Sequence, residues 1–502
     1  MENPKRIAVI GTGYVGLVAG ACFADWGHRV TCVDLDAGRI DLLNRGGIPI
    51  YEPGLAEVVE RAVKAGNLSF TTKVADAVAG CDAAYIAVGT PPSKTDGEAD
   101  LSFVFECARQ IARVIRPGAV IVTKSTVPVG TGDIVERIVE DARPGEHIPV
   151  VSNPEFLREG SAINDFTNPD RVVIGTEDEG AKATLLAIYQ PLKARGHAVV
   201  VTRRRSAELI KYASNAFLAA KITFINEMAD LCEAVEADVA DIALGVGLDS
   251  RIGPHFLHAG PGYGGSCFPK DTLALIRTAQ EHGVSLRIVE ETVQANSARK
   301  RRMAMKVRHV LHGNVEGKKI AILGLTFKAD TDDMRDSPAI PMIELLQRSG
   351  AEIHAYDPQG EANAKTLFED VTFHEDPYGC AAQADAVVFM TDWEVLKHLD
   401  LARLASIMES PVMIDLRRIY PPEAAARQGF VVETIGRLGS EPHPVDAYAP
   451  TFLAQDIAAG THRGRSLPAY QKQGGLPSQY VNQEEQLFGE LIERKDENFE
   501  IA

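Results

Sequence analysis

The sequence predicts an α/β protein with two parallel-sheet domains joined by a long central helix. Residues 6–10 form a predicted apolar strand, which a glycine-rich loop and an apolar helical segment follow. Residues 318–325 again predict a strand and a glycine loop, and residues 350–357 again run from Gly through a strand to Asp. Between these halves, residues 208–235 have few helix breakers and apolar residues at mixed three and four spacing, which predicts one long helix.

The N-terminal glycine loop has the pattern of a dinucleotide-binding site. Gly11-Thr12-Gly13-Tyr14-Val15-Gly16 follows a strand and opens a helix, and Asp34 ends the next apolar strand. Gly11 permits a tight turn, Gly13 lets a pyrophosphate approach the helix N-terminus, and Gly16 brings the helix close to the strand. A carboxylate at Asp34 binds a ribose and repels a 2′-phosphate, so we expect a Rossmann-like domain that prefers NAD to NADP. The glycine triplet alone is a weak signal, and the flanking strand and helix strengthen it.

We divide the chain into four parts. Residues 1–205 form a first α/β domain, residues 206–307 a helical central part and residues 308–440 a second α/β domain. Residues 441–502 are polar and Gly-rich, which predicts a flexible tail. Its apolar stripe suits either docking on a partner or on the chain itself, or a transient helix, and we favour the transient helix. Strands are expected near residues 83–88, 119–123, 386–390 and 412–415. That apolar stripe comprises Val481, Leu487, Phe488, Leu491 and Ile492.

Composition narrows the class of protein. The 502 residues exceed the usual size of one hydrophobic core, and the net charge of −17 argues against a nucleic-acid or anionic-membrane surface. An anionic substrate must therefore be held by local cations. Seven scattered cysteines without metal or CxxC spacing are typical of a reducing compartment, so we expect a cytoplasmic protein without a metal site. We also expect neither a signal peptide nor a membrane-spanning segment.

A glycine-rich run at residues 260–271 presents one thiol, Cys267, beside Lys270 and Asp271. Glycines allow close approach of a ligand, and a thiolate attacks carbonyl carbons to form covalent intermediates. A nearby lysine lowers the pKa of a thiol, which favours the thiolate. The structural alternative is a small buried cysteine in a glycine-rich turn, which is the commoner situation for a cysteine taken alone.

Lys211 and Asn215 lie four residues apart on the predicted central helix, so both side chains emerge from one face. An amine and an amide would then point together into a cleft. A lysine on a helix is more often a solvated surface charge. Similarly, the charged loop at residues 327–336 suits a phosphate ligand with a network of ion pairs, although such runs are more often solvated loops.

Several blocks occur in the order of a known family. They are Tyr51-Glu52-Pro53-Gly54-Leu55, Val88-Gly89-Thr90-Pro91, Ser125-Thr126-Val127-Pro128-Val129-Gly130-Thr131, Asn153-Pro154-Glu155-Phe156-Leu157-Arg158-Glu159-Gly160, Glu208-Leu209-Ile210-Lys211-Tyr212-Ala213-Ser214-Asn215, the cysteine run, and Phe327-Lys328 through Arg335. Over residues 5–440 the chain resembles the UDP-glucose/GDP-mannose dehydrogenase family, and within it the UDP-glucose branch. The resemblance implies oxidation of UDP-glucose to UDP-glucuronate with two molecules of NAD. It also assigns NAD to the first domain and the UDP-sugar to the second.

The resemblance implies a covalent mechanism. Cys267 attacks the aldehyde to give a thiohemiacetal, its oxidation gives a thioester, and water releases the carboxylate. Glu155 corresponds to the general base for that hydrolysis, although a carboxylate in a Pro-Glu turn is as often structural. Lys211 corresponds to the group that assists alcohol deprotonation and stabilises oxyanions. Asn215, together with a water held by Thr126 and Asp271, polarises the reacting oxygen.

The resemblance also implies binding contacts. The expected cofactor contacts are Gly11, Gly13, Tyr14, Val15, Gly16, Asp34, Arg39, Thr90, Pro91, Ser125, Thr126, Glu159, Lys270 and Arg335. The expected substrate contacts are Glu155, Phe156, Leu157, Arg158, Glu159, Lys211, Asn215, Arg251, Phe256, Leu257, His258, Ala259, Gly260, Gly264, Lys328 and Arg417. Arg251 corresponds to an arginine contributed by a neighbouring subunit, which implies a homodimer whose active sites are completed across the interface.

Two alternatives remain open from the sequence. A dehydrogenase of GDP-mannose or of a UDP-N-acetylhexosamine would use the same cysteine, although residues 126–130 and the Phe-Pro after Cys267 are closer to the UDP-glucose branch. A catalytically silent nucleotide-sugar sensor would keep the fold for binding alone. The joint presence of Cys267, Lys211, Asn215 and Asp271 argues against such a sensor.

Overall fold

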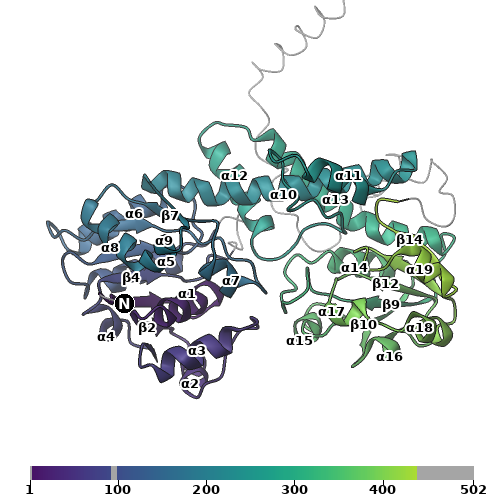
Figure 1. The fold of residues 1–502 in the computed structure, drawn as a ribbon, viewed down its shortest axis with the longest axis horizontal. Coiled ribbons are helices and arrows are strands. Elements are labelled where there is room, and N and C mark those ends of the chain that lie inside the picture. The colour runs from purple at the N-terminus through teal and green to yellow at the C-terminus, as the bar shows by residue number, and fades with distance from the viewer. Residues whose placement is uncertain (1–2, 92–98, 438–502) are drawn as a thin grey trace, which may run out of the picture. The chain divides into compact units, whose positions relative to one another are not determined.

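The computed structural model describes residues 3–91 and 99–437, which belong to one compact unit (Figure 1). The predicted tail at residues 441–502, with its apolar stripe, lies outside the described residues. Every helix in the described ranges is too short or too polar to cross a bilayer.

The first sheet has eight strands in the order β3-β2-β1-β4-β5-β6-β7-β8. They are β1 Arg6–Ile10, β2 Arg29–Val33, β3 Leu68–Thr71, β4 Ala83–Ile86, β5 Val120–Thr123, β6 Val150–Ser152, β7 Arg171–Gly175 and β8 Ala198–Thr202. All neighbours are parallel except β6 and β7, where Ser152 pairs antiparallel with Gly175. The predicted parallel-sheet domain is confirmed, and the antiparallel pairing of β6 with β7 is a local departure that the sequence does not reveal, because apolar patterning marks a strand but not its direction.

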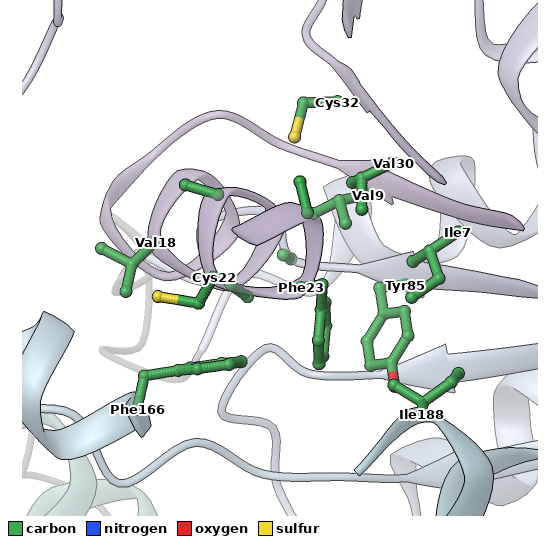
Figure 2. Packing of buried hydrophobic residues seen from close by; sticks show 14 of the residues in the cluster. Ile7, Val9, Val18, Cys22, Phe23, Val30, Cys32, Tyr85, Phe166 and Ile188 are labelled. Atoms are coloured by element: carbon green, nitrogen blue, oxygen red, sulfur yellow. The ribbon is translucent and has the colours of Figure 1, made fainter. Parts of the chain in front are cut away.

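Nine helices accompany this sheet in the described residues. They are α1 Tyr14–Asp25, α2 Ala37–Asn44, α3 Leu55–Lys64, α4 Val74–Val78, α5 Ser102–Ala112, α6 Thr131–Ala142, α7 Ala162–Thr167, α8 Glu179–Ile188 and α9 Gln190–Ala194. Helix α1 is apolar on all sides and is buried from Gly16 to Ala24, as such a helix must be in water. Figure 2 shows Phe23 of α1 between Phe166 and Tyr85, with both ring-centroid distances 5.2 Å. This aromatic cluster packs helix α1 between strand β4 and helix α7.

The predicted long central helix is confirmed as α10, Arg204–Val235, which begins four residues before the predicted start. Three further helices follow it, α11 Val239–Gly247, α12 Phe268–Glu281 and α13 Arg287–Val310. Helices α10 and α12 pack against each other, and α13 contacts both. The glycine-rich run at residues 260–267 leads directly into α12.

The second sheet has six parallel strands in the order β11-β10-β9-β12-β13-β14. They are β9 Lys319–Leu323, β10 Glu352–Tyr356, β11 Val371–Phe373, β12 Ala386–Phe389, β13 Val412–Asp415 and β14 Val431–Thr434. Its helices are α14 Ala339–Arg348, α15 Glu361–Ala364, α16 Pro377–Ala381, α17 Glu394–Lys397, α18 Leu401–Ile407 and α19 Pro422–Arg427. The order equals that of the first six strands of the first sheet, so both sheets offer a ligand crevice at the carboxyl ends of their strands.

The two halves differ at the acidic residue that ends their second strand. Asp357 is buried and accepts hydrogen bonds from the Leu325 amide at 2.6 Å and from the Trp393 indole at 3.2 Å. Its carboxylate also accepts from the amide and hydroxyl of Thr326. Asp357 occupies the position in the second domain that Asp34 occupies in the first. Donors from its own domain surround its carboxylate, which leaves no exposed oxygen for a ribose.

A buried ion cluster ties the central helices to the second sheet. The ammonium of Lys306 on α13 lies 2.9 Å from Glu233 on α10 and 2.5 Å from Glu433 on β14. All three side chains are buried, and Glu233 also accepts a hydrogen bond of 2.8 Å from the Gly436 amide. Buried carboxylates need such partners, because an unpaired charge is strongly destabilising in the interior.

Candidate active site

The glycine loop after β1 has the geometry that a dinucleotide requires. Gly11 has a φ of +105°, and a Cβ there would lie 2.5 Å from the Ala87 carbonyl oxygen. A Cβ on Gly16 would collide with the Gly11 carbonyl oxygen, whereas one on Gly13 would meet no atom within 4 Å. The fold itself therefore requires Gly11 and Gly16. The open space at Gly13, beside the N-terminus of α1, fits the approach of a pyrophosphate.

Asp34 lies at the carboxyl end of β2 next to this loop. One carboxylate oxygen accepts hydrogen bonds from the Thr12 amide at 2.9 Å and the Thr12 hydroxyl at 2.6 Å, and the other accepts from the Asp36 amide at 3.0 Å. Partial burial opposes the charge, but these hydrogen bonds outweigh it and lower the pKa of Asp34. Arg39 lies 4.0 Å away and is half-exposed. Asp34 is therefore an ionised acceptor at the position expected for the ribose.

The loops after β4 and β5 lie side by side at the same edge of the sheet. The Thr90 hydroxyl donates to the Thr126 carbonyl at 3.0 Å, and the Ser125 hydroxyl donates to the Val88 carbonyl at 2.7 Å. The bond from Thr90 fixes the backbone of Thr126, which is half-buried. The other predicted cofactor contacts in the glycine loop and the loop after β4 are Tyr14, Val15 and Pro91. Every predicted NAD contact up to Thr126 thus belongs to the carboxyl edge of the sheet or to the adjoining start of helix α1 or α2.

Cys267 is the half-buried cysteine of the chain, and the other six are buried. It occupies the N-cap position of α12, where Pro269 follows in the first turn. Its thiol lies 3.5 Å from the Ser266 hydroxyl. Burial raises the pKa of Cys267, with Glu155 and Asp271 acting in the same direction, whereas the positive charge of Lys211 lowers it. Among the charges around Cys267, that of Lys211 therefore favours the thiolate.

Lys211 and Glu155 form a buried ion pair with an Nζ–Oε1 distance of 3.0 Å. Burial opposes both charges, but the mutual attraction outweighs it, so the pKa of Lys211 is raised and that of Glu155 is lowered. The Phe156 ring lies 5.4 Å from the Lys211 ammonium and 3.7 Å from the guanidinium of Arg171. Both members of the pair are thus charged at neutral pH, and aromatic packing fixes the backbone beside them.

Asn215 points from α10 to Asp271 on α12, as the i, i+4 spacing with Lys211 predicts. The Asn215 amide donates to one Asp271 oxygen at 2.6 Å, and the Lys270 ammonium lies 2.7 Å from the other. Both Asn215 and Asp271 are buried. In this arrangement Lys270 faces Asp271, whereas the sequence placed it among the cofactor contacts.

Glu159 connects the cysteine loop with the loop at residues 327–336. Its carboxylate accepts hydrogen bonds from the Ser266 hydroxyl at 3.2 Å and the Thr331 hydroxyl at 3.1 Å, and Arg335 lies 3.4 Å away. The Lys328 ammonium donates to the Glu159 carbonyl. Burial, reinforced by neighbouring Asp333, raises the pKa of Glu159. The polar loop predicted to bind phosphate thus makes an ion-pair network, with Lys328 and Arg335 part of it.

The predicted substrate loop at residues 256–260 borders a cavity of about 400 Å³. Arg417 contributes to its wall and donates from its guanidinium to the carbonyls of Met390 at 2.8 Å and Phe327 at 2.7 Å. Phe256 has a positive φ of 64°, which is strained for a non-glycine residue. The residues lining the cavity are Val239, Ala240, Ala243, Leu244, Pro254, Leu257, His258, Ala259, Arg417 and Arg418.

Three predicted substrate contacts face other partners. Arg251 pairs with Asp249 at 2.6 Å, and its side chain is 87% exposed. Arg158 pairs with Asp165 at 2.6 Å, and Gly264 lies so close to the Asp336 carbonyl that a Cβ would collide with it. Of these, Arg251 stands apart, because its high exposure leaves it available to a molecule outside the chain.

Sequence reasoning missed Lys124, which is buried at the end of β5. Its ammonium donates to the carbonyl and side-chain oxygens of Asn153 at 3.3 and 3.4 Å. Burial lowers the pKa of Lys124 to about 8, while Glu155 acts in the opposite direction. A lysine directly after the strand Val120-Ile121-Val122-Thr123 was the available signal, since such a position is seldom exposed.

Models of one family match nearly the whole described chain. The NAD binding domain of the UDP-glucose/GDP-mannose dehydrogenase family matches residues 5–193, its central domain residues 205–298 and its UDP binding domain residues 321–422. The chain belongs to the UDP-glucose/GDP-mannose dehydrogenase family. Strands β1 to β7 of its first sheet accordingly lie in the family's NAD binding domain, which confirms the predicted cofactor.

Relatives agree with this assignment. A UDP-glucose 6-dehydrogenase of Rhizobium meliloti is 55% identical over 434 residues, covering 86% of this chain and 99% of the relative. The solved UDP-glucose dehydrogenase of the archaeon Pyrobaculum islandicum is 40% identical with a TM-score of 0.79, covering 87% and 98% of the two chains. The solved UDP-D-ManNAc dehydrogenase of Pyrococcus horikoshii is 28% identical with a TM-score of 0.75, covering 86% and 99%.

Proposed function

We propose that the chain oxidises the C6 alcohol of UDP-glucose to the carboxylate of UDP-glucuronate, reducing two molecules of NAD. The observation that carries the proposal is the position of Cys267 under the influence of the buried Lys211–Glu155 pair and of Asp271. The higher identity to the UDP-glucose enzymes than to the UDP-D-ManNAc enzyme supports this substrate. The combination of a nucleophile, two fixed charges and a carboxamide argues against a silent sensor.

The first oxidation depends on charges already present in the site. NAD, when bound, accepts each hydride. The Lys211 ammonium, kept charged by Glu155, stabilises the negative charge that develops on the C6 oxygen. The Asn215 amide contributes a further donor, and the hydroxyl proton leaves to a water between Thr126 and Asp271.

The second oxidation uses the thiol. Cys267 adds to the aldehyde carbon, and the carbonyl oxygen takes a proton to give a thiohemiacetal. Loss of a hydride and of the hydroxyl proton converts this adduct to a thioester. Glu155, whose pKa is lowered, removes a proton from water, and the resulting hydroxide displaces the thiolate to release the acid.

The four parts of the chain divide these tasks in our proposal. Residues 1–205 bind NAD, residues 206–307 carry the cysteine and the subunit contact, and residues 308–440 bind the UDP-sugar. Lys328 and Arg417, with the loop at residues 256–260, supply the local cations and the walls that an anionic UDP group needs. Residues 441–502 take no part in this proposal.

The outer face of α10 has the features of a homodimer interface. Phe217, Phe224 and Leu231 follow one another at intervals of seven residues and are 69%, 48% and 52% exposed. Large apolar side chains at this spacing share one helix face, and such an exposed stripe is typical of an interface. The exposed Arg251 then reaches the site of the second subunit. Seven free cysteines suit the reducing cytoplasm, where we place the enzyme.

The proposed activity is tested by following NADH formation with UDP-glucose, UDP-N-acetylglucosamine, UDP-N-acetylmannosamine and GDP-mannose. We expect two NADH per UDP-glucose consumed and the highest kcat/KM for that sugar. Preference for an N-acetylated sugar or GDP-mannose would contradict the substrate assignment. Binding without NADH formation from any of the four would favour the sensor.

A further inference from the structure

Glu52 lies between the NAD glycine loop and the segment that carries the two site carboxylates, residues 155–160. It is 7% exposed. One carboxylate oxygen accepts a hydrogen bond of 2.7 Å from the Ala162 amide, and the other accepts one of 2.7 Å from the Gly160 amide. The Tyr14 hydroxyl donates a short hydrogen bond to this second oxygen. Three donors from two distant parts of the chain therefore converge on one buried carboxylate.

The two amides need an acceptor from elsewhere. They lie at the N-terminus of α7, where the first backbone N–H groups of a helix have no partner within it. Ser161, at the N-cap position, makes no side-chain capping bond. Glu52, 110 residues away in the sequence, takes that role for Ala162. Glu52 lies three residues before Leu55, the first residue of α3, and its carbonyl accepts the Leu55 amide at 3.2 Å, so its own backbone is held in place.

Tyr14 provides the connection to the cofactor loop. It is the first residue of α1 and lies within the glycine pattern of residues 11–16. Burial and the hydrogen bond to Glu52 raise the pKa of Tyr14, so the phenol keeps its proton and donates it. The same hydroxyl lies 3.1 Å from the carbonyl oxygen of Arg158, which belongs to the segment at residues 155–160.

That segment presents a carboxylate to each side of the site. Glu155 pairs with Lys211 at 3.0 Å, and Glu159 accepts the Ser266 hydroxyl at 3.2 Å, directly beside Cys267. A displacement of the segment by a few tenths of an ångström would lengthen both contacts. Since an active-site group misplaced by about 1 Å can cost a hundredfold in rate, its anchor is important for turnover.

We infer that Glu52 is a positioning residue, which holds the segment at residues 155–160 in register with the NAD glycine loop through Tyr14, Gly160 and Ala162. This inference rests on the proposed function for its effect on turnover. Its structural part is independent of any substrate, because the three hydrogen bonds exist within the chain itself.

The test replaces Glu52 by Gln, which preserves size but converts one acceptor oxygen into an NH₂ donor facing N–H or O–H groups. In the ligand-free protein we expect faster amide hydrogen exchange in the peptide covering residues 155–167. We expect kcat for UDP-glucose to fall ten- to hundredfold, with the KM for NAD within threefold. The acid limb of the kcat profile moves to higher pH, because Glu155 loses part of the stabilisation that Lys211 provides. Glu57→Gln, the same change at an exposed position of α3, is the matched control and leaves all these quantities unchanged.

Tyr14→Phe tests the link separately, since it removes one of the three bonds and keeps Glu52. We expect a smaller rise in exchange and a three- to tenfold loss of kcat, and we expect the double variant to resemble Glu52→Gln because the two changes share a bond. Unchanged exchange in Glu52→Gln, or a fall in kcat with the acid limb unmoved, would overturn the positioning role. A wild-type protein inactive on UDP-glucose would instead contradict the proposed function, and the exchange measurement would still decide on Glu52.

Discussion

Asn215 on α10 donates a hydrogen bond of 2.6 Å to Asp271 on α12. Lys211 lies one turn before Asn215 on the same helix face, and Cys267 occupies the N-cap position of α12. One buried bond therefore sets the distance between the helix that carries the ammonium and the helix that carries the thiol. The arrangement accounts for a thiol whose raised pKa is opposed by a lysine from another element.

Replacement of Cys267 by Ala is expected to abolish formation of the acid, because neither a thiohemiacetal nor a thioester can form. Cys267→Ser is expected to lower turnover by several orders of magnitude while UDP-glucose affinity changes little. Cys107→Ala, at a buried position of α5, is the control for loss of a sulfur and retains turnover. Steady-state kinetics and calorimetric titration measure these quantities. Turnover near the wild-type value in either Cys267 variant would rule out the covalent mechanism.

Asp34→Ala is expected to weaken NAD binding by about 1–2 kcal/mol, the scale of a hydrogen bond to a charged group. It is also expected to narrow the preference for NAD over NADP, because the charge that repels a 2′-phosphate is gone. Asp34→Asn separates the two effects, since it removes the charge and keeps one acceptor for the Thr12 donors. Equal use of NAD and NADP by the wild-type protein would show that Asp34 does not face the ribose.

The affinity for UDP-glucose is expected to fall below pH 6. Burial raises the pKa of Asp415 to about 6, although its carboxylate accepts backbone hydrogen bonds from Arg417 and Tyr420, both at 3.0 Å. Because the folded pKa lies above the ordinary value, protonation begins as the pH falls through about 6, and the loop bearing Arg417 loses an acceptor. The KM for UDP-glucose should rise there while the KM for NAD stays constant. Asp415→Asn should have a high KM at every pH, and a parallel rise of both KM values would contradict this explanation.

Lys306→Met is expected to reduce the free energy of unfolding by about 3–5 kcal/mol, because it removes the ammonium that contacts the two buried carboxylates of Glu233 and Glu433. Chemical denaturation measures the loss. Lys365→Met, which breaks an exposed pair with Glu361 on α15, is the control and should change stability by less than about 1 kcal/mol. Similar losses of unfolding free energy in the two variants would mean that the buried cluster contributes no more to stability than an exposed ion pair.

Phe224→Glu is expected to convert the proposed dimer into monomers, since it places a charge in the middle of the apolar stripe on α10. Light scattering after size-exclusion chromatography gives the mass. If Arg251 acts across the interface, turnover should fall when the dimer is lost. Arg251→Ala should lower turnover without changing the mass. A monomeric wild-type protein with full turnover would refute both statements.

The features that the sequence predicted correctly depend on residues that are close together in the sequence. Gly11 and Gly16 lie where the helix meets the strand, and the conflict their Cβ atoms would create is confirmed. Lys211 and Asn215 share a helix face because four residues separate them. The roles of these residues in binding and catalysis stay predictions until they are measured.

The features that sequence reasoning missed depend on distant partners. Glu52 accepts hydrogen bonds from two backbone amides that lie more than 100 residues away in the sequence, and its neighbours Tyr51 and Pro53 do not indicate these contacts. Lys124 was overlooked because its burial follows from the packing of Asn153 and Phe166 around it. The antiparallel pairing of Ser152 on β6 with Gly175 on β7 likewise depends on tertiary contacts, which no local pattern encodes.

The burial of the Asp357 carboxylate by its own loop and Trp393 has a consequence for the order of steps in the reaction. Two domains share one strand order, but the second has no open acidic acceptor for a ribose at this position. Two hydride transfers then pass through a single dinucleotide position, so reduced cofactor must depart and fresh cofactor arrive between them. The aldehyde intermediate has to stay in the site during that exchange, and an aldehyde without a covalent bond to the protein diffuses away. In the proposed mechanism the covalent bond to Cys267 retains the aldehyde during the exchange, so the lifetime of that adduct has to exceed the time for replacing NADH.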